Sequence, residues 1–186
     1  VNGVSITTTT DLLDMLFDGY NKKSIAEKLQ NVNENNKFYK KQLEITQDNI
    51  ENLSKEYQEN LSFEQIKERL NTAIINSNSL MIDLKTTLID RLSDNVFNSA
   101  EKADVNYKLD TINNKFEEML GYSDALIDMM AENSNDVDTT SFLEYQLSLQ
   151  KMLADLIVEI KIVTDDNKEN ITLADISSIT SDMTTI

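Results

Sequence analysis

The sequence predicts an all-α fold, in which long helices pack as an elongated antiparallel hairpin or bundle with coiled-coil contacts. Across 186 residues there is no proline and there are only three glycines, so the residues that most disrupt helix interiors are nearly absent. Apolar residues recur at alternating steps of three and four over long stretches, which is the spacing that packed helices require. We therefore expect long helices that contact other helices.

Residues 1–20 are expected to form a flexible N-terminal segment that carries one short helix. Residues 1–10 are small, β-branched and polar, which is typical of an extended or disordered terminus. Residues 11–17 can form a helix that ends at Gly19. Its dense apolar face predicts docking onto another part of the molecule or onto a neighbour. That face consists of Leu12, Leu16 and Phe17.

Residues 21–165 are expected to form the helical bundle, which begins with a polar helix over residues 22–60. This helix has only a weak heptad pattern, and the asparagine-rich residues 31–36 predict a break within it. Ser62 and Gln65 match a capping box, which predicts the start of a second helix. The heptad pattern of this second helix is stronger and consists of Ile66, Leu70, Ile74, Ser77, Met81, Leu84, Leu88 and Leu92.

The most regular heptad pattern in the chain predicts a third helix, with Ser99 as its cap. Its heptad positions, which are apolar except for Ser123, alternate steps of four and three without exception, which is typical of coiled-coil packing. They are Val105, Leu109, Ile112, Phe116, Met119, Ser123, Leu126 and Met130. Gly121 lies inside this helix at a cost of about 1 kcal/mol, and residues 132–140 are the clearest loop.

A fourth helix is predicted after this loop, with Ser141 and Glu144 as its capping box. Its apolar residues are Phe142, Tyr145, Leu149, Met152, Leu156, Ile160 and Val163. Residues 165–167 are expected to end it. Residues 166–186 are expected to form a C-terminal tail with a short helix that opens at Thr172.

The chain is strongly acidic, because 17 basic residues against 33 acidic residues give a net charge of −16. Such a surface repels phosphate and anionic lipid headgroups, which argues against nucleic-acid and membrane-surface binding. Most of this charge, a net of −12, lies in residues 103–186. The imbalance favours a solvated acidic exterior, and the alternative is a surface for a basic partner or for cations.

The sequence predicts no stable membrane insertion and no cleavable signal peptide. No stretch approaches the roughly 20 apolar residues of a spanning helix, because Asp155 and Glu159 interrupt the most apolar segment. The first residues lack the basic and apolar regions of a secretory signal. We therefore expect a soluble protein that is secreted without a cleavable signal, or is otherwise cytoplasmic.

Catalysis is not expected. The chain has no histidine or cysteine and no glycine-rich phosphate loop, so it lacks the commonest general bases and nucleophiles. The helical spacing of most carboxylates predicts solvated outward faces. Asp165, Asn167 and Glu169 loosely match a calcium loop, but Asn170 and Ile176 stand where that loop needs glycine and a bidentate glutamate. The sequence thus predicts no enzyme, no metal site and no cofactor.

Two short strings in the fourth predicted helix resemble secreted proteins of type III secretion systems. Residues 146–152, Gln-Leu-Ser-Leu-Gln-Lys-Met, are similar to a run in the C-terminal helix of EspA-like filament proteins. Residues 142–146, Phe-Leu-Glu-Tyr-Gln, resemble the start of the needle-subunit helix. The resemblance implies a helical filament or needle protein with a role in virulence. Its terminal helices would pair and assemble end to end with other copies, and residues 62–130 would be an inserted helical region.

These observations favour a non-enzymatic helical assembly protein, secreted or surface-exposed, that packs through coiled-coil faces into a filament or a secretion-apparatus complex. Its expected partners are other copies of itself, helical proteins, or both. The alternative is an intracellular adaptor, chaperone-like or phage structural protein that binds a client through grooves between helices. The candidate interaction and core residues are Leu12, Leu16, Phe17, Val105, Leu109, Ile112, Phe116, Phe142, Gln146, Leu149, Met152, Leu156 and Ile160.

Overall fold

The computed structural model describes residues 22–30, 32–91, 96–133, 139–165, 177, 179–181 and 183. Within these residues the regular structure is helical and there is no strand, so the predicted all-α fold is confirmed. The principal helices are α2 (Lys22–Leu29), α3 (Lys37–Asn60), α4 (Phe63–Arg91), α5 (Ser99–Asn133) and α6 (Thr140–Val163). Two expectations lie outside the described residues: the short helix over residues 11–17, and the start of the C-terminal helix at Thr172.

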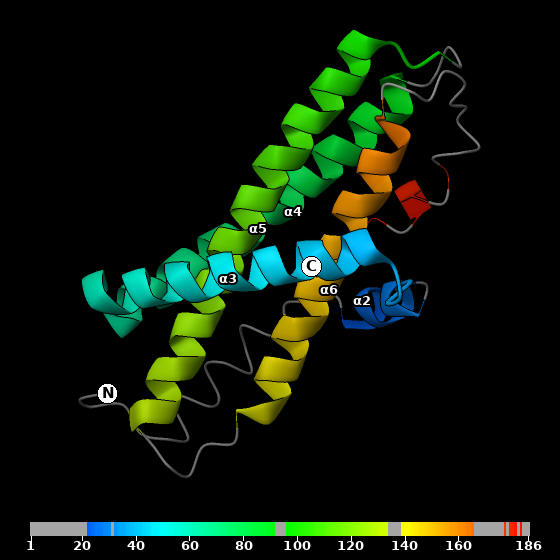
Figure 1. The fold of residues 1–186 in the computed structure, drawn as a ribbon. Coiled ribbons are helices and arrows are strands. Elements are labelled where there is room, and N and C mark those ends of the chain that lie inside the picture. Colours follow the sequence, from blue (N-terminus) through cyan, green and yellow to red (C-terminus); the bar gives the residue numbers. More distant parts are fainter. Residues whose placement is uncertain are drawn as a thin grey trace.

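Helix α5 organises the fold because it packs against α3, α4 and α6. Helices α4 and α5 form a long hairpin, and α6 returns along α5 (Figure 1). Helix α3 lies across α5 and α6 rather than beside them over its whole length, and α2 packs against α6. The helices therefore form a bundle with one crossing member. Coiled-coil packing of the individual pairs remains a prediction.

Side-chain caps define the starts of α3 and α4. The Asn36 side chain accepts hydrogen bonds from the backbone N–H groups of Phe38 and Tyr39, at 2.9 and 3.3 Å, so the predicted break before residue 37 is present. The capping box predicted for Ser62 and Gln65 also forms. The Gln65 N–H donates to Ser62 Oγ at 3.2 Å, and the Ser62 N–H donates to Gln65 Oε1 at 2.9 Å.

Two of the predicted caps are wrong. Helix α5 is capped by Asn98 rather than Ser99, because Asn98 and Glu101 form a reciprocal capping box with bonds of 2.9 and 3.3 Å. Helix α6 begins at Thr140, so Ser141 lies inside it and cannot serve as the N-cap. Its N-cap residue, Thr139, makes no side-chain capping hydrogen bond.

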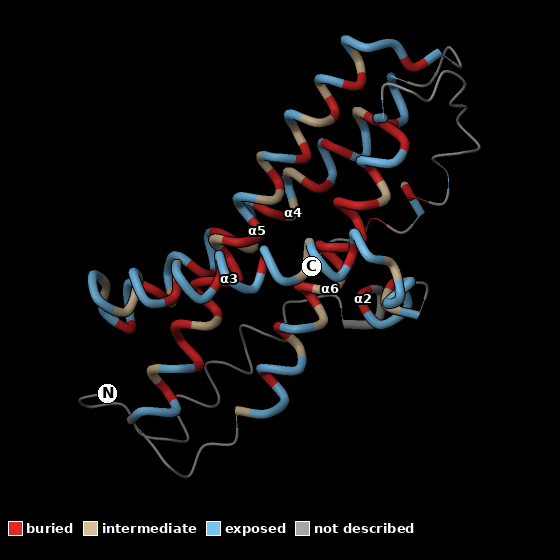
Figure 2. The backbone as a smooth tube through the Cα atoms, viewed as in Figure 1, coloured by how far each residue is buried: buried red, intermediate tan, exposed pale blue. Residues whose placement is uncertain are grey.

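The core follows the predicted heptad faces and extends beyond them. All eight predicted positions of α5 are buried, and so are several residues on its other sides, including Leu120, Ala125 and Ile127. In α6 every residue from 152 to 158 is buried. Figure 2 shows this dense burial along α6 and the adjoining part of α5. Three helices surround α5, so one apolar face would not suffice to cover it.

Candidate interaction surface on helix α4

The predicted site residues that the structure describes form the interior of the chain. Ten of the thirteen are described, and each is between 0 and 6% exposed. Nine of these ten belong to one hydrophobic cluster in which α5 and α6 meet. Leu12, Leu16 and Phe17 lie outside the described residues. The predicted heptad faces therefore hold the helices of this chain against each other.

Gln146 is the polar member of the predicted set, and it links α5 to α6. It is 4% exposed and accepts a hydrogen bond from Ser123 Oγ at 3.0 Å. Its Nε2 donates to Asp124 Oδ1, also at 3.0 Å. A buried amide with partners for both its acceptor and its donor adds specificity to helix packing without the cost of an unpaired polar group.

Two carboxylates depart from the expectation of solvated outward faces. Asp155 and Glu117 are 8% and 5% exposed, because they lie where a third helix covers the flank of α6 or α5. Burial raises the pKa of the Glu117 carboxyl, and hydrogen bonds from Asn49 and Asn113 oppose that rise. Glu117 Oε1 has no hydrogen-bond partner among the described residues. The position is energetically costly for a charged group.

Two shallow grooves lie along α5, the first beside α3 and the second beside α4. One, of about 400 Å³, is lined by Asn49, Asn52, Leu53, Tyr57, Asn114, Glu117 and Glu118. The other, of about 370 Å³, is lined by Glu68, Arg69, Thr72, Ala73, Asn76, Lys115, Glu118 and Tyr122. Both grooves are open and carry amide and charged side chains beside apolar ones, so neither encloses a small molecule in the way that a ligand pocket does.

The described residues contain neither a membrane-spanning helix nor a metal-binding cluster. None of the helices in the ranges given above is long and apolar enough to cross a membrane. The same ranges contain no cluster of three or more His, Cys, Asp or Glu side chains that could hold a metal ion.

The most distinctive surface lies on α4. Three isoleucines at seven-residue intervals are exposed there, Ile75 at 62%, Ile82 at 56% and Ile89 at 42%. Exposed serine and threonine residues fill the positions between them at steps of three and four. We call the complete set the outer stripe, and it consists of Thr72, Ile75, Ser79, Ile82, Thr86 and Ile89.

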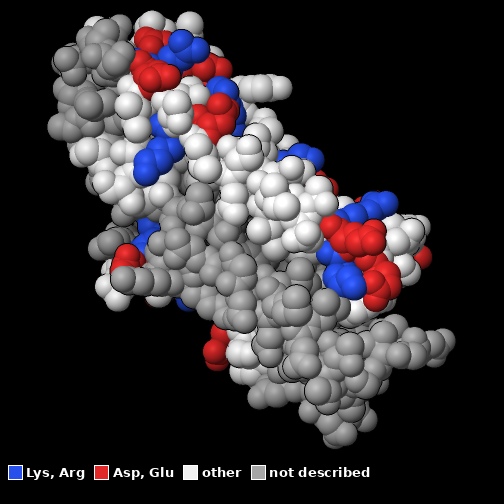
Figure 3. All heavy atoms as spheres, turned by 180° about the vertical axis from the view of Figure 1, so that it is seen from behind, with Lys and Arg blue, Asp and Glu red and all other residues white. Residues whose placement is uncertain are grey.

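Apart from Thr72, which borders the groove between α4 and α5, the outer stripe faces away from the bundle. At 3.6 residues per turn it lies roughly opposite the buried face of α4, whose members include Leu70, Ser77 and Leu84. In the described part of the chain α4 packs substantially against α5 alone, which leaves the opposite side of the helix open. Seen from behind in Figure 3, an area with few charged side chains separates two groups of charged residues.

This composition is unusual for a solvent-facing helix surface. β-Branched residues lose side-chain freedom in a helix, and each costs up to about 0.7 kcal/mol relative to alanine. Scattered exposed apolar residues are ordinary on other helices, such as Ile45 of α3 and Leu147 of α6. Helix α4 instead repeats one β-branched residue at a fixed interval of seven, which is the spacing of a helix-binding face.

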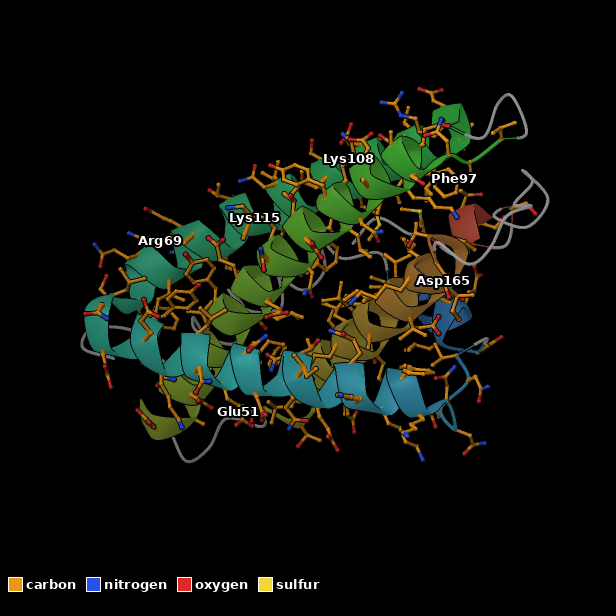
Figure 4. All side chains as sticks on the ribbon, turned by 45° about the horizontal axis from the view of Figure 1, so that its top comes forward. Glu51, Arg69, Phe97, Lys108, Lys115 and Asp165 are labelled. Carbon is orange, nitrogen blue, oxygen red and sulfur yellow. The ribbon has the colours of Figure 1, made fainter. Side chains whose placement is uncertain are left out.

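Charged residues border the outer stripe. Arg69 projects outward near the start of α4, and Lys115 and Lys108 lie further along the same edge of the α4–α5 hairpin (Figure 4). Lys108 Nζ contacts Asp83 Oδ2 of α4 at 2.7 Å, which fixes one of the bordering charges. Lys85 and Asp90 are exposed beside the stripe. An uncharged centre with a charged border is the usual composition of a protein–protein contact.

The comparisons with known proteins add no assignment to this surface: no family model, no curated protein and no solved structure matches the chain.

The sequence contains a pattern for the outer stripe that our prediction missed. Residues 72–89 contain a second alternation of steps of three and four, interleaved with the stronger pattern that runs from Ile66 to Leu88. The outer stripe is weaker because half of its positions are hydroxyl residues.

Proposed function

We propose that this protein is a non-enzymatic helical assembly protein that binds a helix of its partner along the outer stripe of α4. The observation that carries the proposal is the exposure of Ile75, Ile82 and Ile89 at seven-residue spacing on a helix that already has a complete buried face. A helix with two opposite apolar faces can pack inside its own chain and against a second molecule at the same time.

The dimensions of the outer stripe suit a helix laid along it. Its six residues span seventeen steps, or about 26 Å at 1.5 Å per residue. Isoleucine side chains one heptad apart can insert between residues of a facing helix, and the intervening Ser and Thr side chains leave room for its knobs. A peptide that binds by β-strand addition would instead need an open sheet edge, and the described residues contain no strand.

The other heptad faces are less suited to contact a partner. The faces of α5 and α6, including Phe116, Leu149 and Leu156, are almost fully buried, so exposing them would require the bundle to open. Removing several large apolar side chains from the core would cost about 1.5–3 kcal/mol for each. The outer stripe is available without that cost. In this proposal the EspA-like string at residues 146–152 contributes to the stability of the subunit, and its resemblance supports a role in a secreted assembly.

Site-specific photocrosslinking in the native host tests the proposal. A benzoylphenylalanine placed at Ile82 should form a crosslinked product whose partner peptide, once sequenced, belongs to a helix with heptad spacing. The matched control carries the same group at Asp110, an exposed position of α5 outside the outer stripe. If position 82 yields no more product than position 110, the proposal is wrong.

A further inference from the structure

We infer that the partner helix is α4 of a second copy of this chain, packed antiparallel about a two-fold axis that passes between residues 80 and 81. This inference rests on the proposed function, since it names the occupant of the outer stripe. Three features of α4 lead to it: the order of large and small residues along the outer stripe, the charges at its two ends, and the open side of the helix.

The residue order fits an antiparallel pair at every position. In antiparallel packing the first residue of the outer stripe faces the last residue of the second copy. Thr72 then faces Ile89, Ser79 faces Ile82, and Thr86 faces Ile75, and the two-fold axis repeats each pair. Every layer combines one isoleucine with one hydroxyl residue, so the six layers have similar volumes. Even layers of this kind pack without voids or overlaps. The Ser and Thr hydroxyls can bond to backbone carbonyls of their own helix.

The bordering charges are complementary in the same register. Arg69 and Asp90 stand at equivalent heptad positions, one before and one after the outer stripe, and both are exposed. Antiparallel pairing brings Arg69 of each copy beside Asp90 of the other, which gives two symmetric ion pairs at the ends of the contact. Towards the middle, Lys85 faces Asn78 and Asp83 faces Asn76. No two like charges face each other across the pair.

A parallel pair is compatible with the charges but not with the layers. It would place Lys85 beside Asp90 of the second copy and Glu64 beside Arg69. In a parallel pair each residue of the outer stripe faces the same residue of the second copy. Isoleucine would then face isoleucine, at the heptad position where parallel two-stranded coiled coils prefer leucine, and hydroxyl residues would face hydroxyl residues. The layers would then alternate between crowded and loosely filled. Packing therefore favours the antiparallel register.

The contact should be reversible. A single helix face about 26 Å long is a small interface, and the net charge of −16 on each chain opposes association, particularly at low salt. We expect a concentration-dependent monomer–dimer equilibrium at physiological ionic strength. Sedimentation velocity of the full chain over a concentration series measures it.

Two substitutions test whether the outer stripe forms this contact. Ile82→Lys should raise the dimer Kd by at least tenfold, because two buried isoleucines become charges in the central layers. The matched control is Ile45→Lys, at an isoleucine of α3 that is 43% exposed, and it should leave the Kd within about twofold. Circular dichroism verifies that both variants keep their helix content. Equal Kd values for the two variants would place the contact elsewhere.

A charge exchange tests the register. Arg69→Asp and Asp90→Arg should each raise the Kd by about tenfold, since each replaces two attractive pairs by two repulsive ones. The double variant should return close to the wild-type value, because opposite charges again meet. In a parallel pair these residues do not meet, so the double variant would be weaker than either single one.

The absence of cysteine from the chain allows an independent test by disulfide formation. An oxidised mixture of Thr72→Cys and Ile89→Cys chains should give a disulfide-linked dimer of one chain of each kind. Thr72→Cys alone should give little, because its two thiols lie about 26 Å apart in the antiparallel pair. The cysteines must bring their Cα atoms within about 7 Å to bond. Efficient dimers of Thr72→Cys alone would indicate a parallel pair and overturn the inference.

The two proposals can fail separately. If the purified chain stays monomeric at every concentration while position 82 crosslinks to a helix of a different protein in the host, the second copy is excluded and the proposed function stands. If the chain is monomeric and position 82 gives no specific product, both are wrong. Intramolecular crosslinking of position 82 to residues 1–20 would also overturn both, because the outer stripe would then be covered by its own chain.

Discussion

Lys28 of α2 and Asp155 of α6 form a buried ion pair, with 2.5 Å between Lys28 Nζ and Asp155 Oδ2. Glu159, one turn further along α6, lies 3.1 Å from the same ammonium group. Burial alone lowers the pKa of Lys28, but the hydrogen bond to Asp155 and the charge of Glu159 outweigh that effect, and its pKa is raised. The short helix α2 is thus attached to the bundle by charge as well as by its apolar residues.

Replacing Lys28 by methionine should lower the free energy of unfolding by about 3 kcal/mol. The reason is that Asp155 and Glu159 lose the ammonium group that neutralises their charge at this buried contact. Urea denaturation at neutral pH measures this loss. The raised pKa means that the contribution of Lys28 is complete below its ordinary value of 10.5 and is lost as the pH rises through the raised value. The difference between wild type and variant should therefore shrink only in strong alkali.

The double variant Lys28→Met, Asp155→Leu separates the ion pair from the packing around it. Replacement of a buried pair by apolar residues of similar size is often close to neutral, so we expect it to recover most of the stability lost by Lys28→Met. A double variant as unstable as the single one would mean that Glu159, which loses its cation in both variants, accounts for the loss rather than Asp155.

Gly121 permits the close approach of α3 to α5. A Cβ atom at this position would lie 2.9 Å from Leu53 Cβ and 3.0 Å from an aromatic carbon of Tyr57. The neighbouring rings of Tyr57 and Tyr122 stack with centroids 4.1 Å apart. Gly121→Ala gains up to about 1 kcal/mol of helix propensity but forces the helices apart. We expect a net loss of about 1–2 kcal/mol in urea denaturation.

Asn114→Ala is the matched control for this prediction. Asn114 is an exposed residue of the same helix, so its replacement raises helix propensity without a steric conflict and should stabilise the protein slightly. If Gly121→Ala were stabilising by a similar amount, the contact between α3 and α5 would be looser than the positions of Leu53 and Tyr57 indicate.

The heptad patterns predicted the helices and their buried faces well. Every position in the predicted α5 and α6 patterns is buried or half-buried, including Val105 and Ile160. Periodicity identifies a buried face because an apolar stripe at 3.6-residue spacing has to be covered. The prediction of a break at residues 31–36 succeeded for a local reason, since Asn36 bonds to the first backbone N–H groups of α3.

Periodicity could not show which helices would pair or at what angle. The role of Gly121 depends on α3 crossing α5 at that residue, and the position of Leu53 in the sequence contains no trace of it. The burial of Glu117 has the same origin, since Asn49 of α3 reaches this carboxyl across the crossing. The candidate site was missed because the stronger pattern on α4 concealed the weaker outer stripe. The buried face of α4 is complete without Ile82, so packing inside this chain does not account for an isoleucine at that position.

The stability of the protein should depend on the ionisation of Glu117. Its folded-state pKa is raised above the ordinary value of 4.5, chiefly by burial. The folded protein therefore holds the proton more tightly than the unfolded chain, and this residue makes stability fall as the pH rises from 4.5 through the raised value. Glu117→Gln should make the protein more stable at pH 7, because a neutral amide can keep the bonds to Asn49 and Asn113.

The gain from Glu117→Gln should disappear below pH 4.5, where wild-type Glu117 is also neutral in both states. Denaturation midpoints measured across this pH range for wild type and variant give the comparison. Glu44→Gln, at an exposed position of α3, removes one negative charge without burial and should change the midpoint at pH 7 much less than Glu117→Gln does. A Glu117→Gln variant less stable than wild type at pH 7 would mean that the charge itself is needed.

Gln146→Leu tests whether the polar link between α5 and α6 stabilises the fold. Leucine fills a similar volume but leaves the Ser123 hydroxyl and the Asp124 carboxylate without the amide that bonds to both. A loss of about 1–3 kcal/mol is expected in urea denaturation, because the hydroxyl is buried. Leu147→Ala changes the adjacent residue of the same string, which is 41% exposed, and should cost much less. If Leu147→Ala were the more damaging change, this string would act through its exposed side, and its contribution to assembly would have to be sought on the outer face of α6.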